Sequence, residues 1–306
     1  MITDTPGVLV GHWTDDVART GCTVILLPEG SVASGEIRGG SPATREFALL
    51  DPVRKVAAVN AVVLSGGSAF GLAACDGVVG WLEEHGLGFP TAVGPVPIVV
   101  GLSLFDLAVG DCSVRPGPGE GRIAAETASA TERRVGQVGA GTGATVGKWL
   151  GRETATAGGI GAATMRSGEL MVSALIVVNA FGFIDDGSTT VDIGPPLLVA
   201  TPDNAFGNTT IGVIVTNARL DKKDCHLLAQ SGHDGLARAL LPAHTDADGD
   251  ALVAVSAGTV EADFFHLRLM TQQVVTRAIR SVGLSPLRPD ARPGELRELG
   301  NVADLG

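Results

Sequence analysis

A small polar junction stands where an irregular segment meets an apolar, β-branched run. Gly207-Asn208-Thr209-Thr210 lead directly into residues 211–216. A threonine hydroxyl at a strained junction can attack the preceding carbonyl, here that of Asn208, to give an ester that water then hydrolyses. The new chain would begin at Thr209, with a hydroxyl nucleophile and an α-amine on one residue, a known nucleophile–base pair. The reference pKa of such an amine, about 7.7–8.0, suits a general base near neutral pH.

The same junction also fits a loop that ends at an ordinary strand, because threonine is a good strand residue. The other motifs are weaker. Residues 139–144 lack the strand and the acidic partner of a dinucleotide fingerprint, and Lys148 is followed by Trp149 rather than by the hydroxyl residue of a phosphate loop. Residues 246–250 begin like a calcium loop, but Ala257 stands where the bidentate glutamate belongs. With the six histidines scattered, we expect no metal and no organic cofactor.

Short apolar runs recur along the chain and are typical of strands buried on both faces. They cover residues 22–27, 61–65, 172–179, 211–216 and 252–256. Apolar residues at helical spacing predict helices over residues 68–85, with Ser68 as the cap, 221–240, with Asp221 as the cap, and 267–282. Buried strands with amphipathic helices between them indicate an α/β layered architecture in which helices cover sheets.

Two segments lack such periodicity. Residues 185–207 are rich in turn residues and predict a long exposed loop or linker, and the tail after Ser285 predicts a loosely held surface segment. Glycine-rich stretches at 38–40, 65–68, 136–147 and 158–161 fit tight turns, or places where the backbone approaches a ligand closely.

The composition describes an acidic, packed protein of 306 residues with a net charge of −11 and 45% apolar residues. Without a basic run, it is a poor candidate for binding nucleic acid or an anionic membrane. The uncharged stretch 86–105 is long enough to cross a bilayer, but Pro90, Pro95 and Pro97 disfavour a continuous helix. The first eleven residues lack the basic region of a signal peptide. Four isolated cysteines are expected to be small buried hydrophobes, and we expect a cytoplasmic location.

Seven short segments in fixed order resemble one family, the self-processing aminopeptidases and amidases of the D-aminopeptidase/esterase, β-aminopeptidase and nylon-oligomer hydrolase type. The segments are 7–11, 36–40, 65–71, 139–143 with Lys148, 177–180, 207–210 and 244–250, and the resemblance extends over roughly residues 6–282. It implies an αββα sandwich like that of the N-terminal-nucleophile hydrolases. It also implies a single hydrolase domain, residues 1–306, cut into a large subunit, 1–208, and a small subunit, 209–306, that stay together.

The resemblance implies a role for each matching residue. Thr209 matches the nucleophile, and Asn179, at the end of a predicted strand, matches the side chain that donates to the oxyanion. Lys148 matches a lysine near the nucleophile, where an ammonium would keep the terminal amine neutral by like-charge repulsion. Asp248 and Asp250 match a polar pair that would hydrogen-bond the amine and the hydroxyl. Side chains two apart on an extended segment point the same way, although both residues also suit a polar turn.

One position departs from the family pattern. Several members carry a tyrosine that assists the oxyanion or the nucleophile, whereas this chain has no tyrosine and places Phe105 at the matching position. Phenylalanine keeps the wall of the pocket and loses the donor. We expect Phe105 to line the pocket together with Ser65, Gly66, Gly67 and Thr210.

The sequence thus predicts a self-processed enzyme that hydrolyses N-terminal amide bonds of short peptides or amino-acid amides. Two alternatives stay open: an acyltransferase that passes the same acyl group to an amine, and a non-catalytic protein that binds a small ligand on this scaffold. The family further implies a homo-oligomer, a tetramer of processed two-chain units. The acidic composition predicts no nucleic-acid or membrane partner.

Overall fold

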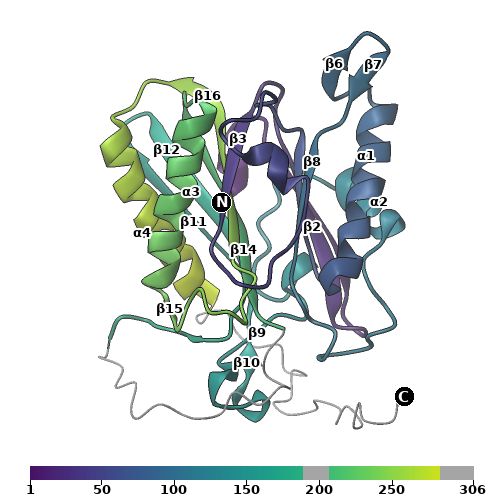
Figure 1. Cartoon of the computed structure of the whole chain (residues 1–306), viewed down its shortest axis with the longest axis vertical. Helices are drawn as coiled ribbons and strands as arrows, with labels where there is room; N and C mark the ends of the chain where they lie inside the picture. Colours follow the sequence, from purple (N-terminus) through teal and green to yellow (C-terminus); the bar gives the residue numbers. More distant parts are fainter. Residues whose placement is uncertain (189–206, 283–306) are drawn as a thin grey trace.

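Two five-stranded sheets stack face to face between two layers of helices, which gives the expected αββα sandwich (Figure 1). The computed structural model describes residues 1–188 and 207–282. Most of the predicted loop 185–207 and the whole of the predicted tail after Ser285 therefore lie outside the described residues.

The first sheet has the strand order β1-β2-β5-β8-β4, and within it β5 and β8 run parallel. Its strands are β1 (Leu9–Asp15), β2 (Thr20–Leu26), β5 (Ala61–Ser65), β8 (Val99–Ser103) and β4 (Ala43–Arg45). Helices α1 (Ala74–Glu84) and α2 (Pro118–Glu126) cover its outer face, where a core that includes Val24, Val63, Val78 and Ala124 is buried.

The second sheet has the order β11-β12-β14-β16-β3, and it places the candidate residues. Its strands are β11 (Gly159–Ser167), β12 (Leu170–Asn179), β14 (Thr209–Ala218), β16 (Ala251–Val260) and β3 (Val32–Ile37). Strand β14 lies at the centre, antiparallel to β12 and parallel to β16. Helices α3 (Lys222–Ala237) and α4 (Phe264–Val282) cover the outer face of this sheet.

Strand β12 shows why its sequence reads as a continuous apolar run. Val172, Ile176 and Val178 face the core under α3 and α4, whereas Leu175 and Val177 face the core between the two sheets. All ten residues of β12 are buried. A strand packed on both faces needs apolar side chains at every position rather than at alternate ones.

The five predicted strands are confirmed, and the three predicted helices are confirmed with changed boundaries. A 3₁₀-helix, Ser68–Ala73, precedes α1, and Ser68 makes no capping bond because it lies inside that turn with a left-handed φ of 54°. The prediction of a serine cap is wrong there. Asp221 does cap α3, with its Oδ1 accepting from the Asp224 backbone N–H at 2.7 Å. The helix ends at Ala237, since residues 240–241 form a short strand.

Smaller elements complete the described chain. They are β6 (Phe89–Thr91), β7 (Gly94–Val96), β9 (Thr145–Val146), β10 (Thr156–Ala157), β13 (Phe183–Ile184), β15 (Leu240–Leu241) and the 3₁₀-turns Ile2–Asp4, Phe47–Leu50, Gly139–Gly141, Lys148–Leu150 and Arg152–Thr154. The uncharged stretch 86–105 thus folds as the β6–β7 hairpin and strand β8.

No helix among the described residues is long and apolar enough to cross a membrane. Three of the cysteines, Cys22, Cys75 and Cys225, are buried as expected. Cys112 is exposed, so the expectation of burial is wrong for that residue.

Candidate active site

Thr209 is the first residue of β14 and lies at the end of the sheet where β12 finishes. Across the antiparallel β12–β14 pair it stands opposite Asn179, the last residue of β12. On its other side Asn208 forms a parallel bridge with Asp248, just before β16 begins. Thr209 is only 4% exposed, and its hydroxyl donates a hydrogen bond to the carbonyl oxygen of Asn208. The nucleophile expected from the sequence therefore touches the carbonyl group that it would attack.

Gly207 gives the junction its unusual geometry. Its φ is +117°, a conformation that residues with a side chain rarely adopt. A Cβ at this position would lie 3.1 Å from the ring of Phe105. The chain therefore enters β14 over the face of Phe105 through a turn that glycine permits.

Lys148 and Asn179 form one hydrogen-bonded cluster with this turn. The Lys148 ammonium donates to the Asn179 backbone carbonyl at 3.0 Å, to Asn179 Oδ1 at 3.1 Å and to the Gly207 carbonyl at 3.2 Å. Asn179 Nδ2 donates to the carbonyls of Phe105, at 3.1 Å, and Gly207, at 3.2 Å. Its Oδ1 also accepts from the Thr145 backbone N–H at 2.9 Å. These bonds fix which end of the amide faces the junction.

Burial lowers the pKa of Lys148 to about 7, an effect that Asp248 opposes and Arg152 reinforces. The residue as a whole is partly exposed, but its ammonium donates hydrogen bonds to the carbonyl oxygens just described. Loss of water around an ammonium favours the neutral amine. With a pKa near 7, both the neutral amine and the ammonium considered in the sequence analysis are accessible to Lys148 near neutral pH.

Asp248 and Asp250 are both 1% exposed and flank the junction, but in the uncut chain their carboxylates bond backbone groups around the nucleophile. Asp248 Oδ1 accepts from the Phe181 N–H at 3.1 Å, and its Oδ2 accepts from the Thr245 hydroxyl at 2.5 Å. Burial, and then the charge of Asp250, raise the pKa of Asp248.

Asp250 Oδ1 accepts from the Thr210 N–H at 2.7 Å, while its Oδ2 lies 2.9 Å from His244 Nδ1. Asp250 thus holds the backbone directly after Thr209, whereas Asp248 holds Phe181 and Thr245. The bonds to the Thr209 amine and hydroxyl expected from the sequence stay a prediction for the processed chain, in which that amine exists.

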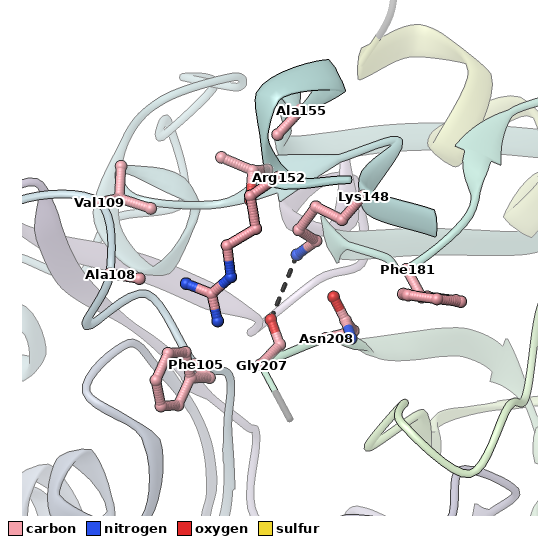
Figure 2. A pocket seen from close by; sticks show the side chains of 10 residues that line it. Phe105, Ala108, Val109, Lys148, Arg152, Ala155, Phe181, Gly207 and Asn208 are labelled. Carbon is pink, nitrogen blue, oxygen red and sulfur yellow. Dashed lines mark hydrogen bonds between the residues drawn. The ribbon is translucent and has the colours of Figure 1, made fainter. Parts of the chain in front are cut away.

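A small cavity of about 30 Å³ opens beside the junction (Figure 2). Its lining includes Phe105, Lys148, Phe181, Gly207 and Asn208, together with Ala108, Val109, Thr145, Arg152 and Ala155. Arg152 extends its guanidinium group toward the space between Lys148 and Phe105 (Figure 2). The sequence predicted Phe105 in this wall. It missed Arg152 and Phe181, although Arg152 stands four residues after the lysine that was singled out.

The other four pocket residues expected from the sequence lie outside this lining. Ser65 is 1% exposed and donates to the Gly66 carbonyl, and the Gly67 N–H donates to the buried carboxylate of Asp106 at 2.7 Å. These residues therefore support the segment that carries Phe105 without lining the cavity themselves. Thr210 is fully buried in β14, one position beyond the nucleophile, so its side chain points away from the cavity side of Thr209.

Comparison with known proteins assigns the family. The model of peptidase family S58 matches residues 1–285. The chain belongs to peptidase family S58. An uncharacterized aminopeptidase of Mycobacterium leprae is 41% identical to this S58 peptidase over 300 residues, which cover 85% of the chain and 79% of the relative. A 6-aminohexanoate-oligomer endohydrolase of Agromyces sp. is 32% identical over 278 residues, which cover 84% of this chain and 75% of the relative. Family membership supports aminopeptidase or amidohydrolase activity.

Solved structures share the fold of this S58 peptidase. A β-aminopeptidase of Burkholderia sp. matches with a TM-score of 0.71 and 22% identity over 92% of this chain and 85% of its own. The L-aminopeptidase D-Ala-esterase/amidase of Ochrobactrum anthropi, described as a variant of the Ntn hydrolase fold, matches with a TM-score of 0.73 and 20% identity over the same shares. The αββα architecture of the S58 peptidase is therefore an N-terminal-nucleophile hydrolase fold.

Proposed function

We propose that this S58 peptidase activates itself by cleavage between Asn208 and Thr209 and then hydrolyses N-terminal amide bonds of short peptides or amino-acid amides. The observation that carries the proposal is the hydrogen bond from the Thr209 hydroxyl to the Asn208 carbonyl at the start of a central strand. The hydroxyl is already beside the one peptide bond whose cleavage would give this threonine a free amine.

Self-cleavage takes two steps. Thr209 Oγ1 attacks the Asn208 carbonyl carbon, the C–N bond breaks, and the hydroxyl proton ends on the released nitrogen of Thr209. The resulting ester is hydrolysed by one water molecule, which leaves a carboxyl group on Asn208 and restores the Thr209 hydroxyl. No redox partner or cofactor enters this balance.

Turnover repeats the chemistry on a substrate. The free α-amine of Thr209 accepts the hydroxyl proton while Oγ1 attacks the substrate carbonyl, and the proton then passes to the leaving amine. One water molecule then hydrolyses the acyl ester, which releases the acid and restores the Thr209 hydroxyl. Departure of Gly207 and Asn208 would free Asn179 Nδ2 to donate to the substrate oxyanion. Preorganised donors of this kind are commonly worth about 2.7–4 kcal/mol of the barrier. Phe105 offers no hydroxyl for this purpose, so the oxyanion relies on Asn179 and backbone N–H groups.

Intact-mass spectrometry under denaturing conditions tests the proposal. Wild-type protein should give two masses, for residues 1–208 and for a chain that begins at Thr209. Thr209→Ala should give one full-length mass and no hydrolysis across a panel of amino-acid p-nitroanilides and amides. Thr5→Val, which removes another buried hydroxyl near the N-terminus, is the control and should be cut like the wild type. A Thr209→Ala protein with full activity would refute the assigned nucleophile.

Two further points belong to the same proposal. An acyltransferase would convert an added amine acceptor into a new amide, and product analysis distinguishes that reaction from hydrolysis. The homotetramer implied by the family is tested by native mass spectrometry of the processed protein.

A further inference from the structure

The carbonyl groups of Gly207 and Asn208 have different hydrogen-bond partners. Asn179 Nδ2 and Lys148 Nζ both donate to the Gly207 carbonyl, each at 3.2 Å. The Asn208 carbonyl, which belongs to the bond to be cut, instead accepts the backbone N–H of Gly249 at 2.9 Å. In the uncut chain, the Asn179 amide expected to stabilise an oxyanion is therefore bonded to the carbonyl one residue before the scissile one.

We propose that the backbone N–H of Gly249 is the oxyanion donor of self-cleavage, a catalytic group separate from the Asn179 amide that serves the substrate. The proposal rests on the self-cleavage proposed above. When Thr209 Oγ1 bonds to the Asn208 carbonyl carbon, the carbonyl electron pair moves onto the oxygen that Gly249 already contacts. The charge returns to the carbonyl when the C–N bond breaks and the Thr209 nitrogen takes the hydroxyl proton.

The donor is held rigidly from the residue before it. Asp248 is fixed through its side chain by the Phe181 and Thr245 N–H groups, each at 3.1 Å, and its own carbonyl accepts from the Ser41 N–H at 2.9 Å. A donor that is already oriented stabilises developing charge without reorganisation at the moment of reaction.

The residue after the donor is held as firmly. Asp250 accepts from the Thr210 N–H through its side chain, and its carbonyl accepts from the N–H of Arg38 at 2.9 Å and of Gly39 at 3.2 Å. The peptide group of Gly249 is thereby clamped between two anchored residues, and it cannot turn its N–H away from Asn208 without breaking these bonds.

The residue type at this position follows from the same contact. A Cβ on Gly249 would lie 2.8 Å from Thr209 Oγ1 and 2.7 Å from the Ser41 carbonyl oxygen. Only glycine lets the loop approach near enough to donate to the Asn208 carbonyl and still leave room for the attacking hydroxyl. The sequence also suggested that this glycine serves a tight turn. Gly249 has no left-handed φ, so the turn itself does not require glycine at this position.

An ordinary strand contact would also place an N–H on this carbonyl, since the Asn208–Asp248 bridge continues the parallel register of β14 and β16. The two interpretations differ in what the bond does. An ordinary hydrogen bond between paired strands contributes to folding and does not change the rate of cleavage. An oxyanion donor changes that rate in a chain that stays folded.

Replacement of Gly249 by glycolic acid during cell-free translation tests the donor directly, because the ester removes the N–H and little else. The matched control is glycolic acid at Gly141, whose N–H makes another backbone bond of 2.9 Å, to Val138. The loss of full-length chain is followed by mass spectrometry after a translation pulse. Resistance to a protease shows that each product is folded. Hydrolysis of the new ester itself gives residues 1–248 and is recognised by mass.

We expect the ester at Gly249 to slow cleavage at Asn208 by about 10²–10³-fold, and the control to cleave at the wild-type rate. Gly249→Ala keeps the N–H but crowds Thr209 Oγ1, and it should also slow cleavage, whereas Gly80→Ala, where a Cβ meets open space, should not. Wild-type rates in the folded Gly249 ester would overturn the inference. A wild-type rate in Gly249→Ala would overturn the requirement for glycine beside Thr209 Oγ1, which is argued from the same contact. If the wild-type chain itself is never cut, it is the proposed function that fails.

Discussion

The surroundings of Lys148 predict how the stability of the protein depends on pH. Its ammonium is enclosed by the carbonyl oxygens of Asn179 and Gly207, and burial lowers its pKa to about 7. In the unfolded chain a lysine titrates near pH 10.4, so between about pH 7 and pH 10 the unfolded chain holds a proton that the folded chain has lost. Stability rises with pH wherever the unfolded state binds more protons. The protein should therefore gain stability from Lys148 as the pH rises through this window.

The size of the gain follows from the two pKa values. Each pH unit above the folded pKa contributes about 1.36 kcal/mol, so from pH 6 to pH 9 Lys148 should add about 3 kcal/mol to the free energy of unfolding. Lys148→Met removes the titrating group and keeps most of the apolar stem. The difference in stability between the parent protein and the Lys148→Met variant should change by that amount in favour of lysine.

The assay is urea unfolding at pH 6 and pH 9, with both proteins made in a Thr209→Ala background so that each remains one chain. Groups that do not interact with Lys148 titrate alike in the two proteins and cancel in the difference. Parallel pH dependences, with a difference that stays constant between pH 6 and pH 9, would refute the lowered pKa of Lys148 and the enclosed ammonium from which it is argued.

Three further outcomes are expected. Asn179→Ala should lower kcat for p-nitroanilide hydrolysis by about 10²–10³-fold with a smaller change in KM, measured on processed enzyme, and an unchanged kcat would remove the amide from the oxyanion site. Leu175→Ala, in the core between the sheets, should lower the free energy of unfolding in urea by about 2–5 kcal/mol, while the exposed Val17→Ala should change it by less than about 0.5 kcal/mol. Asp221→Ala should cost about 1 kcal/mol by the same assay, because it removes the cap on the Asp224 N–H, and an unaltered unfolding curve would contradict that role.

The sequence predicts local elements well where one physical signal dominates. The runs that became β12, β14 and β16 are mainly apolar because both of their faces are buried, and Asp221 caps a helix through a contact only three residues away. The layered fold follows from those elements, and the resemblance to a family adds its αββα form. The serine cap failed because Ser68 is itself the first residue of a 3₁₀-helix that precedes α1, rather than the residue before an α-helix.

The residues of the site also differ in how far the sequence predicts their positions. Residues at strand ends, Thr209 and Asn179, are placed by the strands themselves, and their register brings them opposite each other. The partners of Asp248 could not be predicted, because Phe181 and Thr245 approach it only after distant segments have folded together. The different hydrogen-bond partners of the Gly207 and Asn208 carbonyls also depend on the tertiary structure, since the amino-acid sequence does not distinguish one backbone oxygen from the next.

The position of β14 in its sheet has a consequence for how the protein assembles. Residues after Thr209 supply β14, β16, α3 and α4, while β3, β11 and β12 come from the part before it, and β16 pairs with β3 from near the start of the chain. A cut before Thr209 leaves the contacts in place but changes the molecularity of folding from one chain to two. Refolding of the uncut protein should proceed at a rate independent of concentration, whereas the cut protein must first find its other half. Cleavage at Asn208 after folding would thus leave the sheet intact, whereas cleavage before folding would make assembly of the sheet depend on protein concentration.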